Sequence, residues 1–285
     1  MKEKKIVPYV MIAPYVIHFL VFVSFPVVFS FVLMFHQWNI ISPMKFIGGQ
    51  NFYRLFHDAQ FFRALFNTVI FLLIHIPLQI IIALFFAMLL NQKIKFAGFF
   101  RAAYFMPVIV SGVVVTILWQ QMYGFESGLL NRGLSAMGLR KVGWLVDPAF
   151  AMPSIAVMAT WKNVGLYIVL FLVGLQTVPK HLYEAADIEG AGVWQKFFYI
   201  TLPMINPTMF MVLVMSTIGG FSLFIEPYVM TDGGPLGSTL SAVLYIYKQG
   251  FYYYHMGYAS TMGFFFAGII LIVIFIQRRY VEQRT

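Results

Sequence analysis

Acidic and basic residues are absent from six long stretches of this chain, and their absence constrains the fold more than any other feature. The charge-free stretches span residues 6–44, 64–92, 102–125, 163–179, 197–225 and 249–277. A helix needs about 20 residues to cross the apolar core of a bilayer. Five stretches are long enough, and the fourth becomes so if it starts near Met152 and includes Lys162. The sequence therefore predicts six transmembrane helices near residues 9–35, 66–90, 104–123, 152–176, 205–229 and 258–277.

Composition supports this prediction and excludes several other classes of protein. Of the 285 residues, 61% are hydrophobic and 10% are charged, whereas about 25% are charged in an ordinary soluble domain. A soluble enzyme or a disordered chain is excluded on these grounds. The apolar stretches lack the alternation of transmembrane β-strands, and a helix satisfies its own backbone hydrogen bonds in lipid. The expected fold is an all-α polytopic membrane protein whose first helix is retained rather than cleaved as a signal peptide.

The positions of the basic residues between the predicted spans indicate the orientation of the chain. If both termini are cytoplasmic, eleven Lys and Arg residues lie inside and seven lie outside. Cytoplasmic loops of membrane proteins carry the excess of positive charge. The inner residues that carry the bias most clearly lie at the termini and in the segment 91–103, and they include Lys2, Lys4, Lys5, Lys93, Lys95, Arg101, Arg278, Arg279 and Arg284. The basic residues form no stripe, so we expect no nucleic-acid partner.

Motifs of enzymatic chemistry do not occur in the sequence. No Gly is followed directly by Lys, so a GxxxxGK[ST] phosphate-binding loop is absent. The six His residues have no metal-ligand spacing, and neither Cys nor a GxSxG motif occurs. We expect no catalytic residues, no metal and no cofactor bound by this chain. The remaining classes of membrane protein are transporters and channels.

One predicted cytoplasmic loop contains the densest acidic cluster of the chain. Three of the ten acidic residues, Glu184, Asp187 and Glu189, fall between the fourth and fifth spans. Glu184 to Ala186 favour helix, Gly190 and Gly192 interrupt it, and an amphipathic stretch then resumes at 194–198. The small and acidic residues suit docking against a basic partner. A solvated connector between two spans is the alternative interpretation.

The order of residues in this loop resembles the EAA loop of ABC importer permeases. Glu184-Ala185-Ala186 is followed by Gly190, Phe197 and Leu202-Pro203, and Glu189 stands where the family usually has Asp. Further matches lie along nearly the whole chain, at Asn67-Thr68, Pro107, Trp161, 174–186, 231–235 (TDGGP) and 257–260 (GYAS). These features are similar to the carbohydrate branch, which contains the maltose-type sugar permeases.

The resemblance implies a type I ABC importer permease: a single transmembrane domain over residues 1–285 that includes a coupling loop at 180–204. It further implies a second homologous permease, two ATP-binding subunits that hold ATP and Mg, and an extracellular solute-binding protein, in a bacterial plasma membrane. Transport would proceed by alternating access. The residues expected to dock on the ATP-binding subunit are Glu184, Ala185, Ala186, Asp187, Glu189, Gly190 and Ala191.

Polar side chains within the predicted spans are the candidates for contact with a transported solute, because such groups are costly in lipid. In the family the fourth and fifth spans line the pathway. The expected pathway residues are Thr160, Trp161, Asn163, Tyr167, Ser216, Gly220 and Leu223. Each of them alternatively serves helix packing. His75 is expected to be a buried hydrogen-bonding residue.

Two charged residues within the predicted spans allow different interpretations. Lys162 either faces a polar cavity or extends outward from a span that starts later. Glu226 lies near the outer limit of its span, where it can simply reach the membrane interface.

Three functions follow in order of preference. A sugar importer permease comes first, and a permease for glycerol phosphate or another polar solute comes second. A channel or membrane-embedded enzyme comes third, since neither explains the EAA-like loop.

Overall fold

The computed structural model describes residues 7–92 and 96–281. Several basic residues that indicate orientation lie outside this range, namely Lys2, Lys4, Lys5, Lys93, Lys95 and Arg284. Contacts divide the chain into two compact units: unit 1 comprises Met1–Phe61 and Tyr245–Gly268, and unit 2 comprises Phe62–Leu244 and Ile269–Thr285. Each unit has its own set of contacts, and the single-domain organisation of residues 1–285 stays a prediction.

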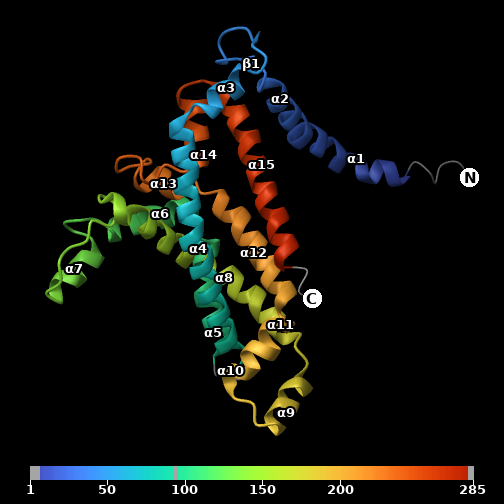
Figure 1. The fold of residues 1–285 in the computed structure, drawn as a ribbon, viewed down its shortest axis with the longest axis vertical. Helices are drawn as coiled ribbons and strands as arrows, with labels where there is room; N and C mark the ends of the chain where they lie inside the picture. The colour runs from blue at the N-terminus through green and yellow to red at the C-terminus, as the bar shows by residue number, and fades with distance from the viewer. Residues whose placement is uncertain (1–6, 93–95, 282–285) are drawn as a thin grey trace, which may run out of the picture. The chain divides into compact units, whose positions relative to one another are not determined.

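Long apolar helices dominate the described part of the chain (Figure 1). Five are long and apolar enough to cross a membrane: Pro8–Leu33, Ala59–Asn91, Pro148–Gln176, Asn206–Met230 and Met256–Arg279. The helices Gly98–Ile109 and Gly112–Met122 supply a sixth span if they are counted together, although they are bent by 97°. The all-α membrane fold is confirmed. The third span, expected as one helix at 104–123, is broken because Val110 and Ser111 leave the helical conformation, and the fifth, expected as one helix at 205–229, is interrupted between Phe221 and Ile225.

Unit 1 is built from the N-terminal helix, a short hairpin and the segments that pack on them. Its strands pair antiparallel with His36 opposite Phe46, and the Asn51 amide donates to the carbonyl oxygens of Met34 and His36 at 2.9 and 3.0 Å. Its elements are α1 (Val7–Phe19), η2 (Leu20–Ser24), α2 (Phe25–Leu33), β1 (His36–Gln37), β2 (Lys45–Phe46), α3 (Gln50–Phe56) and η4 (Lys248–Tyr252). Three helices, α4 (Ala59–Asn91), α14 (Ala242–Tyr247) and α15 (Met256–Val281), contribute residues to both units.

Asp58 organises the polar interior of unit 1. Its carboxylate accepts the backbone N–H groups of Gln60 and Phe61, both at 3.0 Å, and thereby caps α4. The hydroxyl groups of Tyr245 and Tyr258 donate to its other oxygen at 2.9 and 2.6 Å. Burial opposes ionisation of this carboxyl, yet these four hydrogen bonds outweigh burial and lower the pKa of Asp58.

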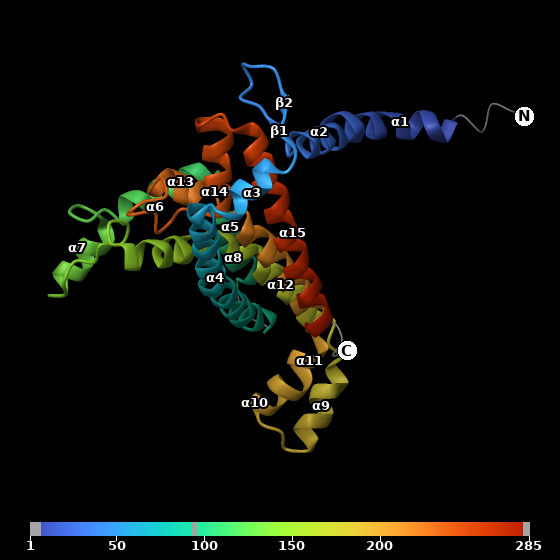
Figure 2. The same cartoon turned by 45° about the horizontal axis from the view of Figure 1, so that its top comes forward.

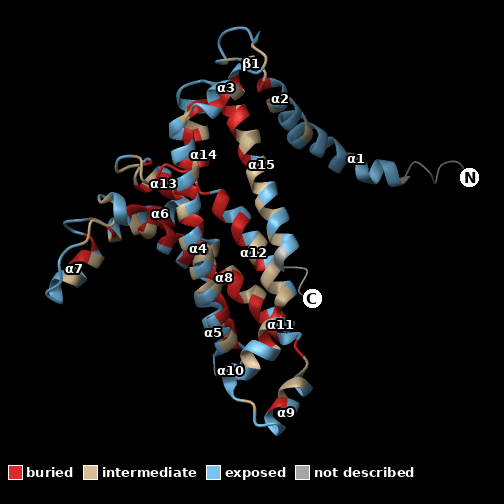
Figure 3. Ribbon diagram, viewed as in Figure 1, coloured by how far each residue is buried: buried red, intermediate tan, exposed pale blue. Residues whose placement is uncertain are grey.

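Unit 2 holds the main apolar core. Buried residues concentrate on α8 (Figure 3), and the core includes Ile168 and Phe171 of α8 and Val212 of α12. Ala83 and Ala87 of α4 are fully buried members of the same core. The elements of unit 2 are α5 (Ala97–Ile109), α6 (Gly112–Met122), α7 (Leu129–Ala136), α8 (Pro148–Gln176), α9 (Lys180–Ile188), α10 (Val193–Lys196), η3 (Phe197–Thr201), α11 (Leu202–Met204), α12 (Asn206–Phe221) and α13 (Ile225–Met230).

Two glycines of α8 allow neighbouring helices to approach closely. A methyl group at Gly165 would lie 2.1 Å from the carbonyl oxygen of Tyr104 on α5. At Gly174 it would lie 2.5 Å from the hydroxyl oxygen of Thr208 on α12. Small residues at such positions let membrane helices pack backbone to backbone. The helix α8 is therefore held on two sides, and it carries most of the predicted pathway residues.

Candidate functional site

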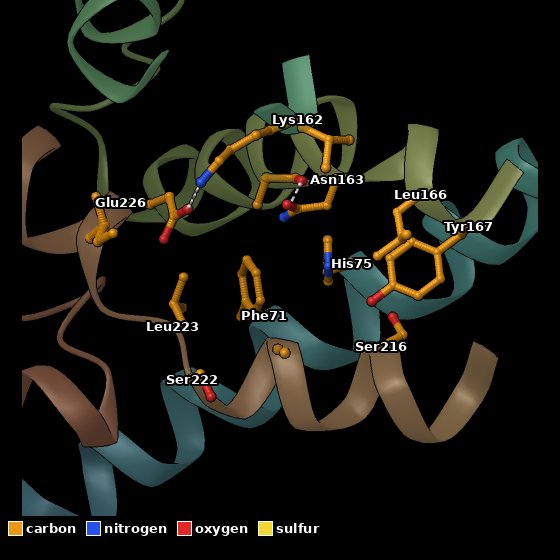
Figure 4. A pocket seen from close by; sticks show the side chains of 15 residues that line it. Phe71, His75, Lys162, Asn163, Leu166, Tyr167, Ser216, Ser222, Leu223 and Glu226 are labelled. Atoms are coloured by element: carbon orange, nitrogen blue, oxygen red, sulfur yellow. Dashed lines mark hydrogen bonds and ion pairs between the residues drawn. The ribbon is translucent and has the colours of Figure 1, made fainter. Parts of the chain in front are cut away.

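A cavity of about 280 Å³ lies in unit 2 among α4, α5, α8, α12 and α13 (Figure 4). It is bordered by aromatic rings, by amide and hydroxyl groups, and by one cation and one anion. The lining residues are Phe71, His75, Val108, Ala159, Lys162, Asn163, Leu166, Tyr167, Ser216, Gly219, Gly220, Ser222, Leu223, Ile225 and Glu226. Rings beside hydrogen-bonding groups suit a ligand that has both apolar faces and hydroxyl groups.

Breaks in two spans occur beside this cavity. The helix α12 ends at Phe221 and α13 starts at Ile225, so the fifth span is interrupted where Ser222 and Leu223 line the cavity. The third span is interrupted after Ile109, close to the lining residue Val108. Irregular backbone at membrane depth is tolerated where it lines a cavity or is buried in protein. The third and fifth spans therefore both contain non-helical backbone next to this cavity.

His75 is held in one orientation by α8. The Thr160 hydroxyl oxygen lies 2.8 Å from Nδ1 of His75 and 2.8 Å from the Ala156 carbonyl oxygen, so the imidazole is hydrogen-bonded to α8 through Nδ1. The Phe71 ring stacks on the imidazole with centroids 4.9 Å apart. As expected, His75 is buried and hydrogen-bonded, and it also lines the cavity.

Ser216 links the cavity to α4. Its hydroxyl donates to the side-chain oxygen of Gln79 at 2.6 Å, and both residues are buried. The Gln79 amide nitrogen has no hydrogen-bond partner among the described residues. Figure 4 shows the Tyr167 hydroxyl pointing toward Ser216. Tyr167 and Ser216 therefore present two hydroxyl groups at the same end of the cavity.

Lys162 and Glu226 face each other within the cavity. Their Nζ and Oε1 atoms are 3.5 Å apart, and the two side chains are 14% and 11% exposed. The helix α8 already starts at Pro148, so Lys162 lies well inside it and does not extend outward from a later start. The interpretation of Glu226 as a residue that reaches the interface is wrong, because Glu226 is buried and turned toward Lys162.

The structure places five of the seven expected pathway residues on the cavity wall: Asn163, Tyr167, Ser216, Gly220 and Leu223. Thr160 is buried behind His75, and Trp161 packs against Trp119 with ring centroids 5.4 Å apart. Neither of these two lines the cavity. Leu166 and Gly219 do line it and were missed, although each follows an expected residue by three positions. Helical spacing applied to Asn163 and Ser216 would have identified them.

A second cavity, of about 1030 Å³, lies in unit 1 among residues 37–54 and 253–258. Arg54 is part of its wall, and the guanidinium carbon lies 4.0 Å from the centre of the Tyr258 ring. The sequence predicts that these segments lie in or next to outer loops. None of the expected pathway residues lines this cavity. Among the described residues, no cluster of three or more His, Asp or Glu side chains could hold a metal ion.

The expected docking loop forms two short helices joined by a sharp turn. In Figures 1 and 2, α9 and α10 lie side by side beyond the ends of α8 and α12. Gly190 has a φ angle of +77°, so glycine supplies the turn as expected. The N–H groups of Gly190 and Ala191 donate to the carbonyl oxygens of Asp187 and Ala186 at 3.1 and 2.8 Å. These two bonds form a Schellman motif that ends α9.

The two helices of the loop are fastened to each other but expose much of their surface. Lys196 pairs with Asp187 at 2.5 Å, and Tyr183 is hydrogen-bonded to Thr201 at 2.8 Å. Of the expected docking residues, Ala186 is buried and Ala191 is half-buried, whereas the rest are exposed: Glu184, Ala185, Asp187, Glu189 and Gly190. Sequence reasoning missed the exposed apolar side chains beside them, above all Ile188 at 89% and Trp194 at 74% exposure.

Comparison with known families and sequences identifies similar proteins along most of the chain. A family model described as binding-protein-dependent transport system inner membrane component matches residues 56–285. The probable ABC transporter permease protein YurN of Bacillus subtilis is 39% identical over 95% of this chain and 93% of its own length. The arabinooligosaccharides transport system permease protein AraP of Halalkalibacterium halodurans is 37% identical, over 96% of this chain and 86% of the relative.

Solved structures show the same architecture. A chain of a bacterial ABC transporter involved in the import of the acidic polysaccharide alginate superposes with a TM-score of 0.83. The two chains are 26% identical, and the match covers 99% of this chain and 96% of the other. A bacterial alginate ABC transporter in complex with an alginate pentasaccharide-bound periplasmic protein matches with a TM-score of 0.82 and 26% identity, over 97% and 94% of the two chains.

Proposed function

The chain belongs to the family of binding-protein-dependent transport system inner membrane components, and we propose that it forms one half of the pathway of a sugar or oligosaccharide importer. The family is a transport permease component, and the described residues include five helices that are long and apolar enough to cross a membrane. The proposed solute class is supported by relatives named for sugars, such as AraP. The observation that carries the proposal is the cavity of unit 2, whose wall combines rings with amide and hydroxyl groups.

The cavity chemistry suits a saccharide. Phe71 and Tyr167 offer ring faces, against which the apolar face of a sugar ring can pack. Asn163, Ser216 and Nε2 of His75 offer groups that form hydrogen bonds with sugar hydroxyl groups. We assign solute contact to Asn163, Tyr167, Ser216, Gly220 and Leu223, and a supporting role to Thr160 through His75.

The proposed partners are a second homologous permease, two ATP-binding subunits and an extracellular binding protein. The alginate transporter bound to its periplasmic protein supports the last of these. We propose that residues 180–204 couple this chain to an ATP-binding subunit, which would hold ATP and Mg. Exposed acidic side chains at Glu184 and Glu189, and the exposed ring of Trp194 in the same loop, support this role. Aromatic residues of this kind often dominate the binding energy of an interface.

Transport by alternating access accounts for the breaks in the third and fifth spans. When ATP closes its two binding subunits, the coupling loops move with them and the two permeases switch between inward-facing and outward-facing states. Segments such as α6 and α13 are short and separated from α5 and α12 by non-helical residues. Such points absorb changes in backbone angles while the packed core of α8 moves as a rigid body.

Docking is tested by the Gly190→Asp variant in the complete importer. Aspartate must take a left-handed conformation there, which costs about 1–2 kcal/mol, and it adds bulk and charge to the exposed turn. Since nothing lies within 4 Å of a methyl group at Gly190, the permease itself should still fold. We expect membrane insertion to be normal and ATP hydrolysis stimulated by the loaded binding protein to be lost. The matched control is Gly192→Ala, because Gly192 has a φ angle of −70°. Normal stimulation in the Gly190→Asp variant would refute the docking assignment.

We propose that both termini and the 180–204 loop are cytoplasmic, in the plasma membrane of a bacterium. The absence of cysteine from the chain makes this directly testable, since single cysteines can be introduced without a background. Ser135→Cys, in the loop between the third and fourth spans, should react with a membrane-impermeant maleimide in intact cells. Glu189→Cys should react only after the membrane is opened. The opposite pattern would reverse the orientation.

A further inference from the structure

Lys162 and Glu226 are the charged side chains of the cavity wall, and they neutralise each other. The ammonium nitrogen and the carboxylate oxygen are 3.5 Å apart. The other lining residues are apolar, aromatic or uncharged polar groups apart from His75, whose Nδ1 is engaged with Thr160. The cavity therefore has one positive and one negative group, and no net charge from this pair.

Residues of three helices form the surroundings of the Lys162 ammonium group. Lys162 extends from α8, and Glu226 lies in the first turn of α13. Gly112 is the first residue of α6, and a methyl group there would lie 2.7 Å from Nζ of Lys162. The lack of a side chain at Gly112 thus leaves room for the ammonium group. The N-terminal end of α6 has a partial positive charge, which disfavours an ammonium group nearby and makes the Glu226 carboxylate necessary.

An anionic ligand is disfavoured in this arrangement. A carboxylate or phosphate would either lie unpaired in a site of low polarity or displace Glu226 from Lys162, which leaves Glu226 unpaired instead. An uncharged saccharide leaves the ion pair intact and is bound by neutral hydrogen bonds. The same contrast separates sugars from glycerol phosphate, the other solute class that the sequence allows.

We propose that the Lys162–Glu226 pair determines charge selectivity, so that this permease accepts uncharged saccharides and rejects uronates, aldonates and phosphate esters. The inference rests on the proposed function of the cavity as the solute pathway. Glu226 is the residue that determines specificity, because it neutralises a cation that would otherwise attract anions. Removal of its charge should turn the cavity into a site that favours anionic sugars.

The test measures binding to the purified importer in lipid nanodiscs without the binding protein, so that the permease alone discriminates. The probes are the alditols of lactose, maltotriose and arabinotriose, each compared with the corresponding aldonate, which differs in carrying a carboxylate in place of the terminal hydroxymethyl group. We expect the wild type to bind the neutral member of at least one pair about tenfold more tightly. In Glu226→Gln we expect that preference to fall by about tenfold or to reverse.

Two further variants keep the result interpretable if Glu226→Gln folds poorly. Lys162→Met/Glu226→Gln removes both charges, and Lys162→Glu/Glu226→Lys exchanges them. Both should keep the preference for the neutral saccharide, since neither leaves an unpaired cation. An unchanged binding ratio in folded Glu226→Gln, or a wild type that prefers the aldonate, would overturn the charge proposal alone.

A different binding result would show that the proposed function itself is wrong. Gly219 lines the cavity, and Gly219→Trp should fill it. If no probe binds the wild type, or if Gly219→Trp leaves binding unchanged, the cavity is not the saccharide site and both proposals fall.

Discussion

The side chains around the cavity of unit 2 and those of the 180–204 loop differ in whether they have partners within this chain. Around the cavity, polar groups find partners within the same chain: His75 with Thr160, Ser216 with Gln79. In the loop, Ile188 and Trp194 remain largely exposed to solvent. Groups paired internally hold a fixed arrangement into which a small solute fits, whereas exposed apolar groups are stabilised only when another protein covers them. The cavity groups contributed by this chain are therefore held in place by the chain itself, whereas the proposed role of the loop requires a partner to cover its exposed side chains.

The largest effect should come from the packing behind the cavity. Gly165→Val should lower the free energy of unfolding by about 3 kcal/mol or more, because even a methyl group there would meet the Tyr104 carbonyl oxygen at 2.1 Å. Gly98→Val on α5 is the matched control, since nothing lies within 4 Å of a methyl group at Gly98. Unfolding of the two variants is followed in detergent by tryptophan fluorescence. Equal stability of the two variants would mean that α8 does not pack tightly against α5 at Gly165.

The next effect should appear in the loop, in association and not in stability. Trp194→Ala should weaken binding of the ATP-binding subunit by about 2 kcal/mol, or roughly 30-fold, because a large exposed ring is a typical interface anchor. The melting temperature of the permease should stay the same. Met137→Ala, another exposed apolar residue outside the loop, should change neither quantity. Affinity is measured by titration of the purified subunit, and loss of stability without loss of affinity would reverse the assignment.

A smaller effect should follow from the loss of one hydrogen bond at the cavity. Ser216→Ala leaves the side-chain oxygen of Gln79 without its donor, which should cost about 1–2 kcal/mol of unfolding free energy. Ser222→Ala is the control, because Ser222 is exposed and its hydroxyl donates to the carbonyl oxygen of Ile218 in the preceding turn of α12. That variant should stay within about 0.5 kcal/mol of wild type. Similar losses in chemical denaturation would show that the internal partner of Ser216 matters little.

The smallest effect should come from the ion pair inside the loop. Asp187 pairs with Lys196 but its side chain is 62% exposed, and exposed pairs contribute about 0.5 kcal/mol or less. Asp187→Asn should therefore barely change thermal stability, and the remaining difference should vanish in high salt. A loss of several kcal/mol would mean that the loop is internally organised like the cavity, and the contrast between the two regions would disappear.

Much of the fold and part of the sites could be predicted from residues that act locally. The apolar stretches predicted the spans. Glu184 to Ala186 and Gly190 predicted a helix that ends in a turn, because helix propensity and the φ angle of a glycine depend on near neighbours. Thr160 and Trp161 were expected in the pathway because a hydroxyl group and an aromatic ring in the fourth span suit a sugar, and they lie outside the cavity wall. Which face a residue of a nearly uniform apolar helix presents is decided by the helices around it, and no periodic pattern in α8 reveals it.

The sequence by itself determined the apolar spans and the resemblance to ABC importer permeases, since charge-free runs and the EAA-like order are properties of contiguous residues. Only the tertiary structure decided that Lys162 meets Glu226, that α5 and α6 diverge by 97°, and that the breaks in two spans border one cavity. The physical reason is that these features depend on which helices contact each other. Gly165 packs on Tyr104 and Gly112 on Lys162, and the two residues of each pair are far apart in the chain.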